Sequence, residues 1–422
     1  GIDMNNWQKK KLGELSRNKN AIVSGPFGSN LKVSDYKDTG IPIFRLQNVG
    51  KGVFINKDIK YISDKKAEEL KYHSFKAGDL VLAKLGIPIG KTCIVPNEFL
   101  RGIIVADVVR LRLDKNIIDY KFLEYFLNSD EAVAQLTGNI TGATRPRVNL
   151  SDVRNMVINM PPLPEQQRIV SLLDKAFAAI DKAKANAEQN LKNAKELFES
   201  YLQGVFENGD WEAKEFSEII TTLTDYHANG SYKILKKNVT LKETEDFAWM
   251  VRSTDFENDF TNDFRYIDKS SYNFLSKSKV YGGEIIMSKI GNAGNVYLMP
   301  RIDKPCSLAM NLFLIRLAEK EAIPEFVFQY LKSYSGEFQI KSRLQGATTK
   351  TITKNNVKSI RIPLPTLNEQ QTIVHQLDAL RAETQKLEAL YQKKIDNLDE
   401  LKKSILQKAF VGELKTEIAV AV

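Results

Sequence analysis

Short apolar runs, rich in β-branched residues and bounded by Gly, Pro, Asn and Asp, occur in two separate stretches of the chain. Such runs predict β-strands, and the clearest of them are residues 41–49, 80–85, 105–113, 285–290 and 312–317. A helical pattern follows in each stretch, at 120–127 and at 324–331. We therefore expect each stretch to form a mixed domain of the α/β or α+β class with a largely β body.

Two further stretches carry apolar or small residues mostly three or four positions apart, the spacing of a coiled-coil helix. In the first stretch these residues are Ile169, Leu173, Ala176, Ile180, Ala183, Ala187, Ala194, Phe198 and Tyr201. In the second they are Ile373, Leu377, Leu380, Leu387, Ile395, Leu398 and Ile405. About 40 helical residues would span about 60 Å, and such a helix cannot bury its apolar seam alone. We expect the two helices to pair with each other and to act as a spacer.

The chain repeats itself once. Trp7 recurs as Trp211, 204 positions later, and the phrase Glu165-Gln166-Gln167 recurs at the same offset as Glu369-Gln370-Gln371. One stretch, 78–84 against 283–289, is shifted by a single further residue, as an insertion between two turns would produce. Two long copies indicate a pseudo-dimer with an internal two-fold relation, which makes the pair of long helices antiparallel.

The repeat and the prolines before each long helix divide the chain into five parts. We place a first globular domain at 4–160, a long helix at 161–206, a second globular domain at 207–364, a second long helix at 365–412 and a C-terminal tail at 413–422.

Charge adds a first indication of function. The 422 residues include 61 Lys and Arg against 52 Asp and Glu, a net charge of +9, which favours a polyanionic partner because phosphate contacts release counterions. The two cysteines, Cys93 and Cys306, are too few for a disulfide framework and fit a reducing cytoplasm. We expect no membrane span and no secretion signal, hence a cytoplasmic protein.

Candidate catalytic motifs are weak. The loop 86–92 is similar to a phosphate-binding loop, but three residues separate its glycines where four are needed, and its repeat at 291–296 lacks the lysine. The histidines His73, His227 and His375 are far apart, and no zinc-ligand spacing occurs. We therefore expect neither a catalytic residue nor a metal ligand in this chain.

Several phrases resemble the specificity subunits of type I restriction-modification systems. The run Gly-Pro-Phe-Gly-Ser-Asn-Leu at 25–31 is similar to the opening of one class of target recognition domain, and the segments 226–232 and 250–255 are similar to another. The phrases at 163–167 and 367–371 resemble the signature that opens the family's long helices. The second has Asn368 where the family usually has Pro, and Asn can cap a helix. The resemblance covers nearly the whole chain.

The resemblance implies a division of labour. Each recognition domain would read one half of a split, asymmetric site on double-stranded DNA, and the helices would set the unspecified spacer. Two methyltransferase subunits would dock on the helices, with S-adenosylmethionine and the adenine-N6 chemistry. Two restriction subunits, which bring ATP, Mg and translocation, are optional. This chain would hold no cofactor of its own.

Base-edge and phosphate contacts need Arg, Lys, Asn, Gln, Ser, Thr, His or Tyr on loops held by a rigid body. In the first copy the candidates are Ser29, Asn30, Arg45, Gln47, Asn48, Lys84, Thr144, Arg145 and Arg147. In the second copy they are His227, Asn229, Tyr232, Arg252, Thr254, Lys289, Asn292, Thr348, Thr349 and Lys350. Lys84 and Lys289 occupy equivalent turns, so phosphate positioning is the role we assign to them. For each of the others, a solvated polar side chain remains the alternative.

Two other functions stay open at this point. An enzyme that acts alone would transfer methyl groups or cut DNA without a partner. A coiled-coil scaffold that binds only protein would show no salt-dependent DNA binding. No code links these loops to bases, so the DNA motif does not follow from the sequence.

Overall fold

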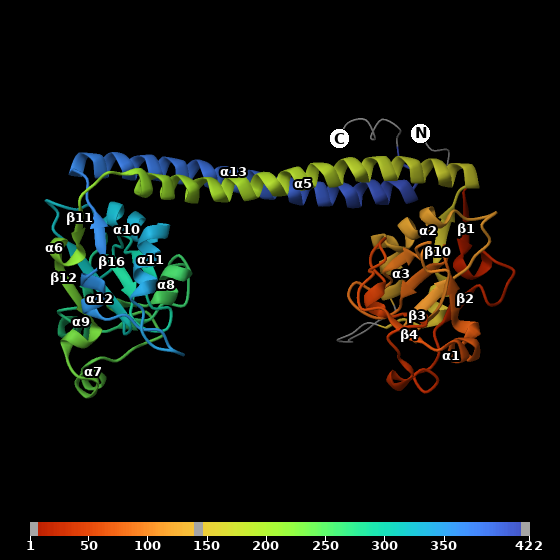
Figure 1. The fold of residues 1–422 in the computed structure, drawn as a ribbon, viewed down its shortest axis with the longest axis horizontal. Helices are drawn as coiled ribbons and strands as arrows, with labels where there is room; N and C mark the ends of the chain where they lie inside the picture. Colours follow the sequence, from red (N-terminus) through yellow and green to blue (C-terminus); the bar gives the residue numbers. More distant parts are fainter. Residues whose placement is uncertain (1–6, 139–146, 415–422) are drawn as a thin grey trace. The chain divides into compact units, whose positions relative to one another are not determined.

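The computed structural model describes residues 7–138 and 147–414. The chain divides into two compact units, one made of residues 1–188 with 392–422 and the other of residues 189–391. Each unit contains one mixed α/β domain and one part of each long helix (Figure 1). The predicted fold class, with two repeated domains and paired long helices, is confirmed.

The first unit holds two four-stranded sheets and a two-stranded one. The first sheet is antiparallel and has the order β2 (Ile22–Ser24), β9 (Val108–Leu111), β6 (Leu80–Ala83), β7 (Thr92–Ile94). The second has the order β4 (Lys60–Ile62), β3 (Ile41–Phe44), β8 (Arg101–Ile104), β5 (Ser74–Lys76), with β3 and β8 parallel. The pair is β1 (Gln8–Lys11) with β10 (Val157–Met160). The helices are α1 (Asp64–Glu69), α2 (Tyr120–Leu127), α3 (Asp130–Thr137) and α4 (Leu150–Asn155).

The second unit repeats this topology strand for strand. Its first sheet has the order β12 (Ile220–Asp225), β19 (Leu312–Leu317), β16 (Ile285–Ser288), β17 (Val296–Leu298). Its second has the order β14 (Tyr266–Ile267), β13 (Ala248–Val251), β18 (Cys306–Leu308), β15 (Lys279–Val280), with β13 and β18 parallel. The pair is β11 (Ala213–Glu215) with β20 (Arg361–Pro363). The helices are α6 (Phe216–Ile219), α7 (Tyr232–Asn238), α8 (Ser253–Glu257), α9 (Lys269–Phe274), α10 (Pro324–Lys332), α11 (Tyr334–Ser342) and α12 (Lys354–Lys358).

One helix of each domain joins the sheets to the long helices. In the first unit, Phe122 and Phe126 of α2 pack against Phe410 with ring centroids 5.3 and 5.4 Å apart. In the second, Phe326 of α10 packs against Phe206 at 5.5 Å. Burying one such ring stabilises the fold by about 1.5–3 kcal/mol, so these contacts anchor each domain to a helix end.

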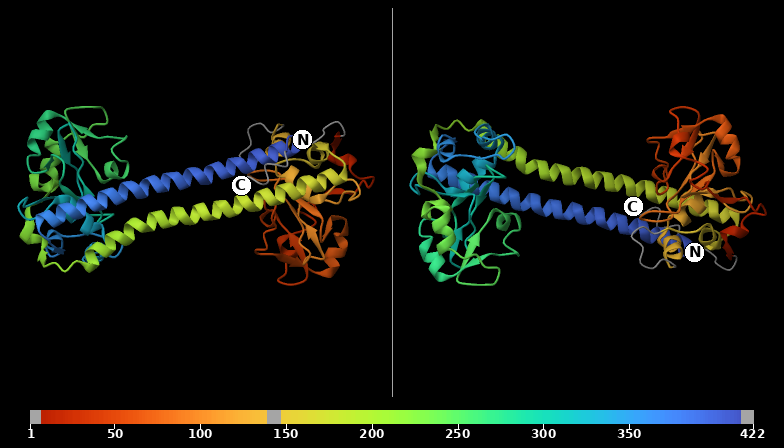
Figure 2. Two further views of the ribbon diagram at one scale, coloured as in Figure 1. Left: turned by 90° about the horizontal axis from the view of Figure 1, so that it is seen from above. Right: turned by 90° about the horizontal axis from the view of Figure 1, so that it is seen from below.

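The long helices are α5 (Leu163–Asn208) and α13 (Leu367–Phe410), and they run side by side within each unit (Figures 1 and 2). Two ion pairs give their direction in the first unit. Lys402 contacts Asp181 at 2.7 Å, and Asp399, one turn earlier on α13, contacts Lys184 one turn later on α5 at 2.6 Å. The pair is therefore antiparallel, as the repeat predicts.

Part of the predicted seam is wrong. Leu387 is 36% exposed and Tyr201 is 40% exposed, whereas Thr384 is buried at 2%. The predicted Leu377, Ile395, Leu398 and Ile405 of α13 are buried, so the seam departs from the prediction in one stretch between them, where Thr384 is buried and Leu387 is exposed. The Arg381 guanidinium lies 4.2 Å from the centre of the Phe198 ring and replaces an aliphatic contact at that turn.

Candidate nucleic-acid interface

In the first domain, Lys84 follows strand β6, and two hydrogen bonds hold its main chain. We call this pair of hydrogen bonds the backbone frame of the lysine. Its N–H donates to the carbonyl of Asp107 at 2.9 Å, and its own carbonyl accepts from Val148 at 3.0 Å. Burial, and then the nearby charge of Arg147, lowers the pKa of the Lys84 ammonium below its ordinary value. Among residues 7–138 and 147–414, no carboxylate lies within ion-pair distance of Lys84. This cation is therefore available to an anionic ligand.

The surroundings of Lys84 suit nucleic acid. Arg147 pairs with Asp107 and remains more than half exposed. Ser24, at the end of strand β2, lines the same cavity as Lys84, is uncharged, and donates its hydroxyl to the carbonyl of Ala106 at 2.9 Å. Lys84 and Arg147 line one cavity together with the aromatic side chains of Phe27 and Tyr72 and with His73. A second cavity shares Ala106 with it and is lined by Arg45, Gln47 and Tyr36.

Arg45 and Gln47 surround one aspartate. The Arg45 guanidinium donates to the Asp58 carboxylate at 2.9 Å and to its backbone carbonyl. The Gln47 amide donates to the same carboxylate at 3.1 Å. These hydrogen bonds, from Arg45 first and then Lys60 and Gln47, hold the pKa of Asp58 at about 2. The Arg45 guanidinium therefore partly serves to hold this loop, whereas the Gln47 side chain is exposed.

Asn48 is a correction to the predicted interface. It is fully buried, and its amide donates to the carbonyls of Ile55 at 3.1 Å and Lys57 at 3.0 Å. Its oxygen accepts from the N–H of Arg45 at 3.0 Å. A side chain with both amide hydrogens used inside the protein cannot donate to a base edge, so Asn48 holds the loop.

Asn229 of the second domain is corrected in the same way. Its amide donates to the carbonyl of Tyr226 at 3.0 Å and to the Ser278 hydroxyl at 2.9 Å, and its oxygen accepts from the N–H of Lys277 at 2.9 Å. It closes the turn after β12 and contributes no free donor.

Lys289 occupies the same backbone frame in the second domain, but with different neighbours. Its N–H donates to the carbonyl of Asn311 at 2.7 Å, and its carbonyl accepts from Ile352 at 3.0 Å. Asp225, at the end of β12, forms an ion pair with Lys289 at 2.9 Å and lies 3.8 Å from Lys354. Burial by itself would raise the pKa of Asp225, but the hydrogen bond and charge of Lys289 and the charge of Lys354 lower it below its usual range.

Arg252 reproduces the geometry of Arg45. Its N–H and its guanidinium contact Asp255 at 2.7 Å each, and the guanidinium also reaches the backbone carbonyl of Asp263. Asp58 and Asp263 both have positive φ, 53° and 57°. Thr254, two residues after the arginine like Gln47, is exposed. The arginine therefore shapes the loop in both domains, and the residue two positions later faces solvent.

The other predicted residues lie at the surface. Those exposed in the first domain are Ser29 and Asn30, and those exposed in the second are His227, Tyr232, Asn292, Thr348, Thr349 and Lys350. Thr144 and Arg145 lie outside the described residues.

The prediction left out several residues that line the site. Phe27 is 83% exposed and stands in the Gly-Pro-Phe-Gly phrase, which could have indicated it. Tyr72 and His73 line the cavity of Lys84, although they come from a helical turn about ten residues earlier in the chain. Asp225 lies between Lys289 and Lys354, at 2.9 and 3.8 Å from their ammonium groups, and no local pattern in the sequence connects the three residues.

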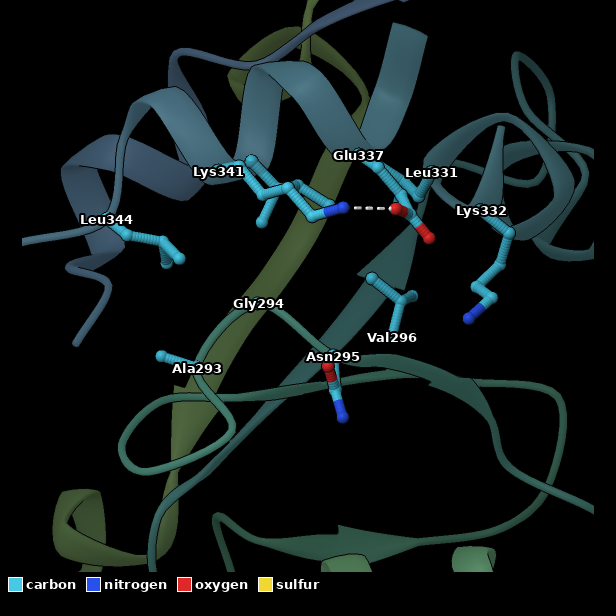
Figure 3. Close-up of a pocket in the computed structure, with 10 residues that line it drawn as sticks. Ala293, Gly294, Asn295, Val296, Leu331, Lys332, Glu337, Lys341 and Leu344 are labelled. Carbon is cyan, nitrogen blue, oxygen red and sulfur yellow. Dashed lines mark hydrogen bonds and ion pairs between the residues drawn. The ribbon is translucent and has the colours of Figure 1, made fainter. Parts of the chain in front are cut away.

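A separate cavity of the second unit lies between the β16–β17 turn and helices α10 and α11 (Figure 3). Its titratable side chains are Lys332, Glu337 and Lys341, and the last two are paired at 2.6 Å. Within residues 7–138 and 147–414, no cluster of three His, Cys, Asp or Glu could hold a metal ion, and no helix there is long and apolar enough to cross a membrane.

Comparison with known proteins gives the family. The sequence model described as "Type I restriction modification DNA specificity domain" matches twice, at residues 4–192 and 208–399. The chain is 25% identical over 450 aligned residues to the putative type I restriction enzyme MjaX specificity subunit of Methanocaldococcus jannaschii, covering 98% of this chain and 97% of that protein. It is 23% identical to the EcoKI specificity subunit of Escherichia coli strain K12, covering 90% of this chain and 84% of that protein.

Solved structures share the fold. A chain from a study of complex assembly and conformational transition in the type I R-M system superposes with a TM-score of 0.74 at 19% identity, over 98% of this chain and all of that chain. The HsdS subunit of Thermoanaerobacter tengcongensis superposes with a TM-score of 0.62 at 18% identity, over 97% and 98%. With two matched recognition domains, strand-for-strand repetition and a paired helix spacer, the chain belongs to the specificity subunits of type I restriction-modification systems.

Proposed function

We propose that each domain of this chain binds one half of a split, asymmetric site on double-stranded DNA, and that the helix pair sets the unspecified spacer between the halves. The observation that carries the proposal is that each domain contains a lysine with the same backbone frame. Lys84 and Lys289 are each held by two backbone hydrogen bonds at the end of equivalent strands. A lysine fixed in this way can locate a phosphate, and phosphate contacts fix the orientation of a reader on the duplex.

Sequence readout is proposed for the variable side chains around each lysine. In the first domain, Arg147 and Gln47 stand at the two adjoining cavities with their polar ends exposed, and Phe27 projects beside them. Arg and Gln can contact purine edges, and an exposed aromatic ring can pack on a thymine methyl group. In the second domain, Thr254 takes the place of Gln47. Different side chains on one scaffold would read different half-sites.

The remaining parts of the proposal concern partners. The chain would carry no catalytic residue and no cofactor. Two methyltransferase subunits would dock on α5 and α13 and bring S-adenosylmethionine, and two restriction subunits with ATP and Mg would be optional. The relatives are named as specificity subunits of type I restriction enzymes, which supports a reader that works inside a larger complex. Because its substrate would be cellular DNA, we propose that it works in the cytoplasm.

The test is methylation sequencing of DNA from cells that express this chain with its cognate methyltransferase subunit, against cells that express the methyltransferase alone. We expect one new split motif with N6-methyladenine in both halves. Methyl transfer by the purified chain without a partner would instead make it an enzyme. Absence of both new methylation and salt-dependent DNA binding would leave a protein-only scaffold.

A further inference from the structure

One buried glutamine ties each recognition domain to the first turn of its long helix. Gln166 of α5 is fully buried. Its side-chain oxygen accepts from the N–H of Asp119 at 2.7 Å, and its amide donates to the carbonyls of Ile117 at 3.0 Å and Pro161 at 2.9 Å. Asp119 is the N-cap of α2. The glutamine therefore joins the starts of α2 and α5 directly.

The second unit contains the same arrangement. Gln370 of α13 is fully buried, and its oxygen accepts from the N–H of Ile323 at 2.8 Å. Its amide donates to the carbonyls of Glu321 and Pro365, both at 2.9 Å. Ile323 is the N-cap of α10.

Two of the three partners of each glutamine share backbone geometry but not side chains, and the third is a proline in both units. Asp119 is replaced by Ile323, and Ile117 by Glu321. Every contact is made to a main-chain N–H or carbonyl, so the side chains at the two differing partner positions do not take part in it. What the two units have in common is one acceptor and two donors at fixed positions.

Only a glutamine side chain places one acceptor oxygen and two donor hydrogens at these positions. Glutamate has no amide hydrogens, and asparagine is one methylene shorter. A buried main-chain group left without its partner destabilises the fold, and three main-chain groups depend on each glutamine side chain. The neighbouring Gln167 and Gln371 are exposed, so the middle residue of each Glu-Gln-Gln phrase has a distinct task.

The contacts fix each domain at a second point. Further along α2, the Phe122–Phe410 contact holds the helix on α13 through an apolar surface, and a hydrogen bond from the Tyr125 hydroxyl to Asp174 joins it to α5. The directional hydrogen bonds of Gln166 add a fixed point at the start of α2, so the helix cannot tilt about those contacts. In the second unit, Gln370 complements the Phe206–Phe326 contact in the same way.

We propose that Gln166 and Gln370 are positioning residues that set the angle and height of each recognition domain on its helix pair, and thereby make the complex accept one spacer length only. This inference rests on the proposed function. One base pair more or less changes the half-site separation by about 3.4 Å and the helical phase by about 35°. A domain fixed at the start of α2 or α10 as well as further along that helix cannot follow that change, whereas a domain without the glutamine hydrogen bonds can tilt about its remaining contacts.

The experiment measures spacer selectivity with the complete chain and its methyltransferase. Gln166→Ala and Gln370→Ala are compared with the matched exposed variants Gln167→Ala and Gln371→Ala by methylation sequencing. We expect the buried variants to keep both half-sites but to methylate sites with spacers one base pair longer or shorter at about a tenth or more of the rate at the normal spacer. The exposed variants should keep the single spacer.

Each result decides the inference. A buried variant with reduced methylation but an unchanged single spacer would overturn it, because a merely structural role lowers activity without relaxing the spacer. If an alanine variant does not accumulate, Gln166→Glu and Gln370→Glu, which keep volume and one acceptor, are judged by the same criterion. Failure of these variants to fold would also overturn the inference in favour of a purely structural role. If the unmodified chain directs no split-site methylation, the proposed function fails before any variant is compared.

Discussion

The two recognition domains present the same lysine in opposite electrostatic settings. Lys84 shares its cavity with the uncharged Ser24, and burial and the charge of Arg147 lower the pKa of its ammonium against the opposing charge of Asp107. Lys289 has Asp225 at the equivalent strand end and forms an ion pair with it at 2.9 Å. The backbone frame around both lysines is the same. The scaffold therefore fixes where a contact is made, and the residues beside it decide how strongly an anion is attracted.

The loops that Arg45 and Arg252 hold, which we call the arginine corners, also differ between the two domains. Arg45 contacts a neutral asparagine and the exposed Asp58, whereas Arg252 contacts Asp255, whose side chain is 3% exposed. A buried carboxylate without its cation is far more costly than an exposed one. The same loop geometry thus depends on a buried carboxylate in the second domain, and on the buried amide of Asn48 with an exposed ion pair in the first.

The largest predicted effect tests this difference between the corners. We expect Arg252→Ala to lower the free energy of unfolding of its unit by about 3 kcal/mol, because Asp255 is left as an unpaired buried charge. Arg45→Ala, the matched variant, should cost about 1 kcal/mol. Calorimetric unfolding of both variants gives the comparison. Equal losses would show that the two corners are held by the same forces.

The next effect concerns DNA affinity. We expect Lys84→Met to weaken binding of the cognate site about tenfold and to reduce the slope of log affinity against log salt by about 1, as for one lost phosphate contact. Lys289→Met should weaken binding by less, because Asp225 already neutralises part of its charge. Salt titrations of the assembled complex by fluorescence anisotropy measure both quantities. A larger loss for Lys289→Met would reverse the comparison.

A charge change in the second domain should make it resemble the first. Asp225→Asn removes the carboxylate that pairs with Lys289 and lies near Lys354. We expect tighter DNA binding by about threefold, with a salt slope steeper by up to about 1. The matched variant Ser24→Asp in the first domain should weaken binding, because it places a carboxylate beside Lys84. The idea fails if both variants shift the affinity in the same direction.

Sequence reasoning recovered the fold because the fold depends on long-range repetition and on periodicity. The offset that joins Trp7 to Trp211 identifies two copies, and the three- and four-residue spacing identifies the helices. It missed one stretch of the α13 seam, where Thr384 is buried in place of the predicted Leu387 and Arg381 covers the Phe198 ring. An arginine that covers an aromatic ring cannot be distinguished by periodicity from one that faces water.

The site could be predicted only at the level of loops. Asn48 and Asn229 follow structured segments and have the polar character of base readers, but their amides are used to hold turns. The difference lies in main-chain groups that only the folded loop brings near. The pairing of Asp225 with Lys289 joins residues 64 positions apart, and the neighbouring copy has Ser24 there. Contacts of this kind follow from strand order, which a single sequence does not reveal.

The smallest predicted effect separates binding from stability at Lys84. Its pKa in the folded chain is lowered, so the charged form destabilises the fold at neutral pH, and this cost disappears as pH rises through the folded pKa toward the ordinary value of 10.5. We expect Lys84→Met to melt up to about 2 °C higher at pH 7, with the difference shrinking near pH 10. Lys289→Met, which loses an ion pair, should melt lower at pH 7. An advantage of Lys84→Met that stays constant with pH would mean that added apolar packing, and not the removal of a poorly solvated charge, raises its melting temperature.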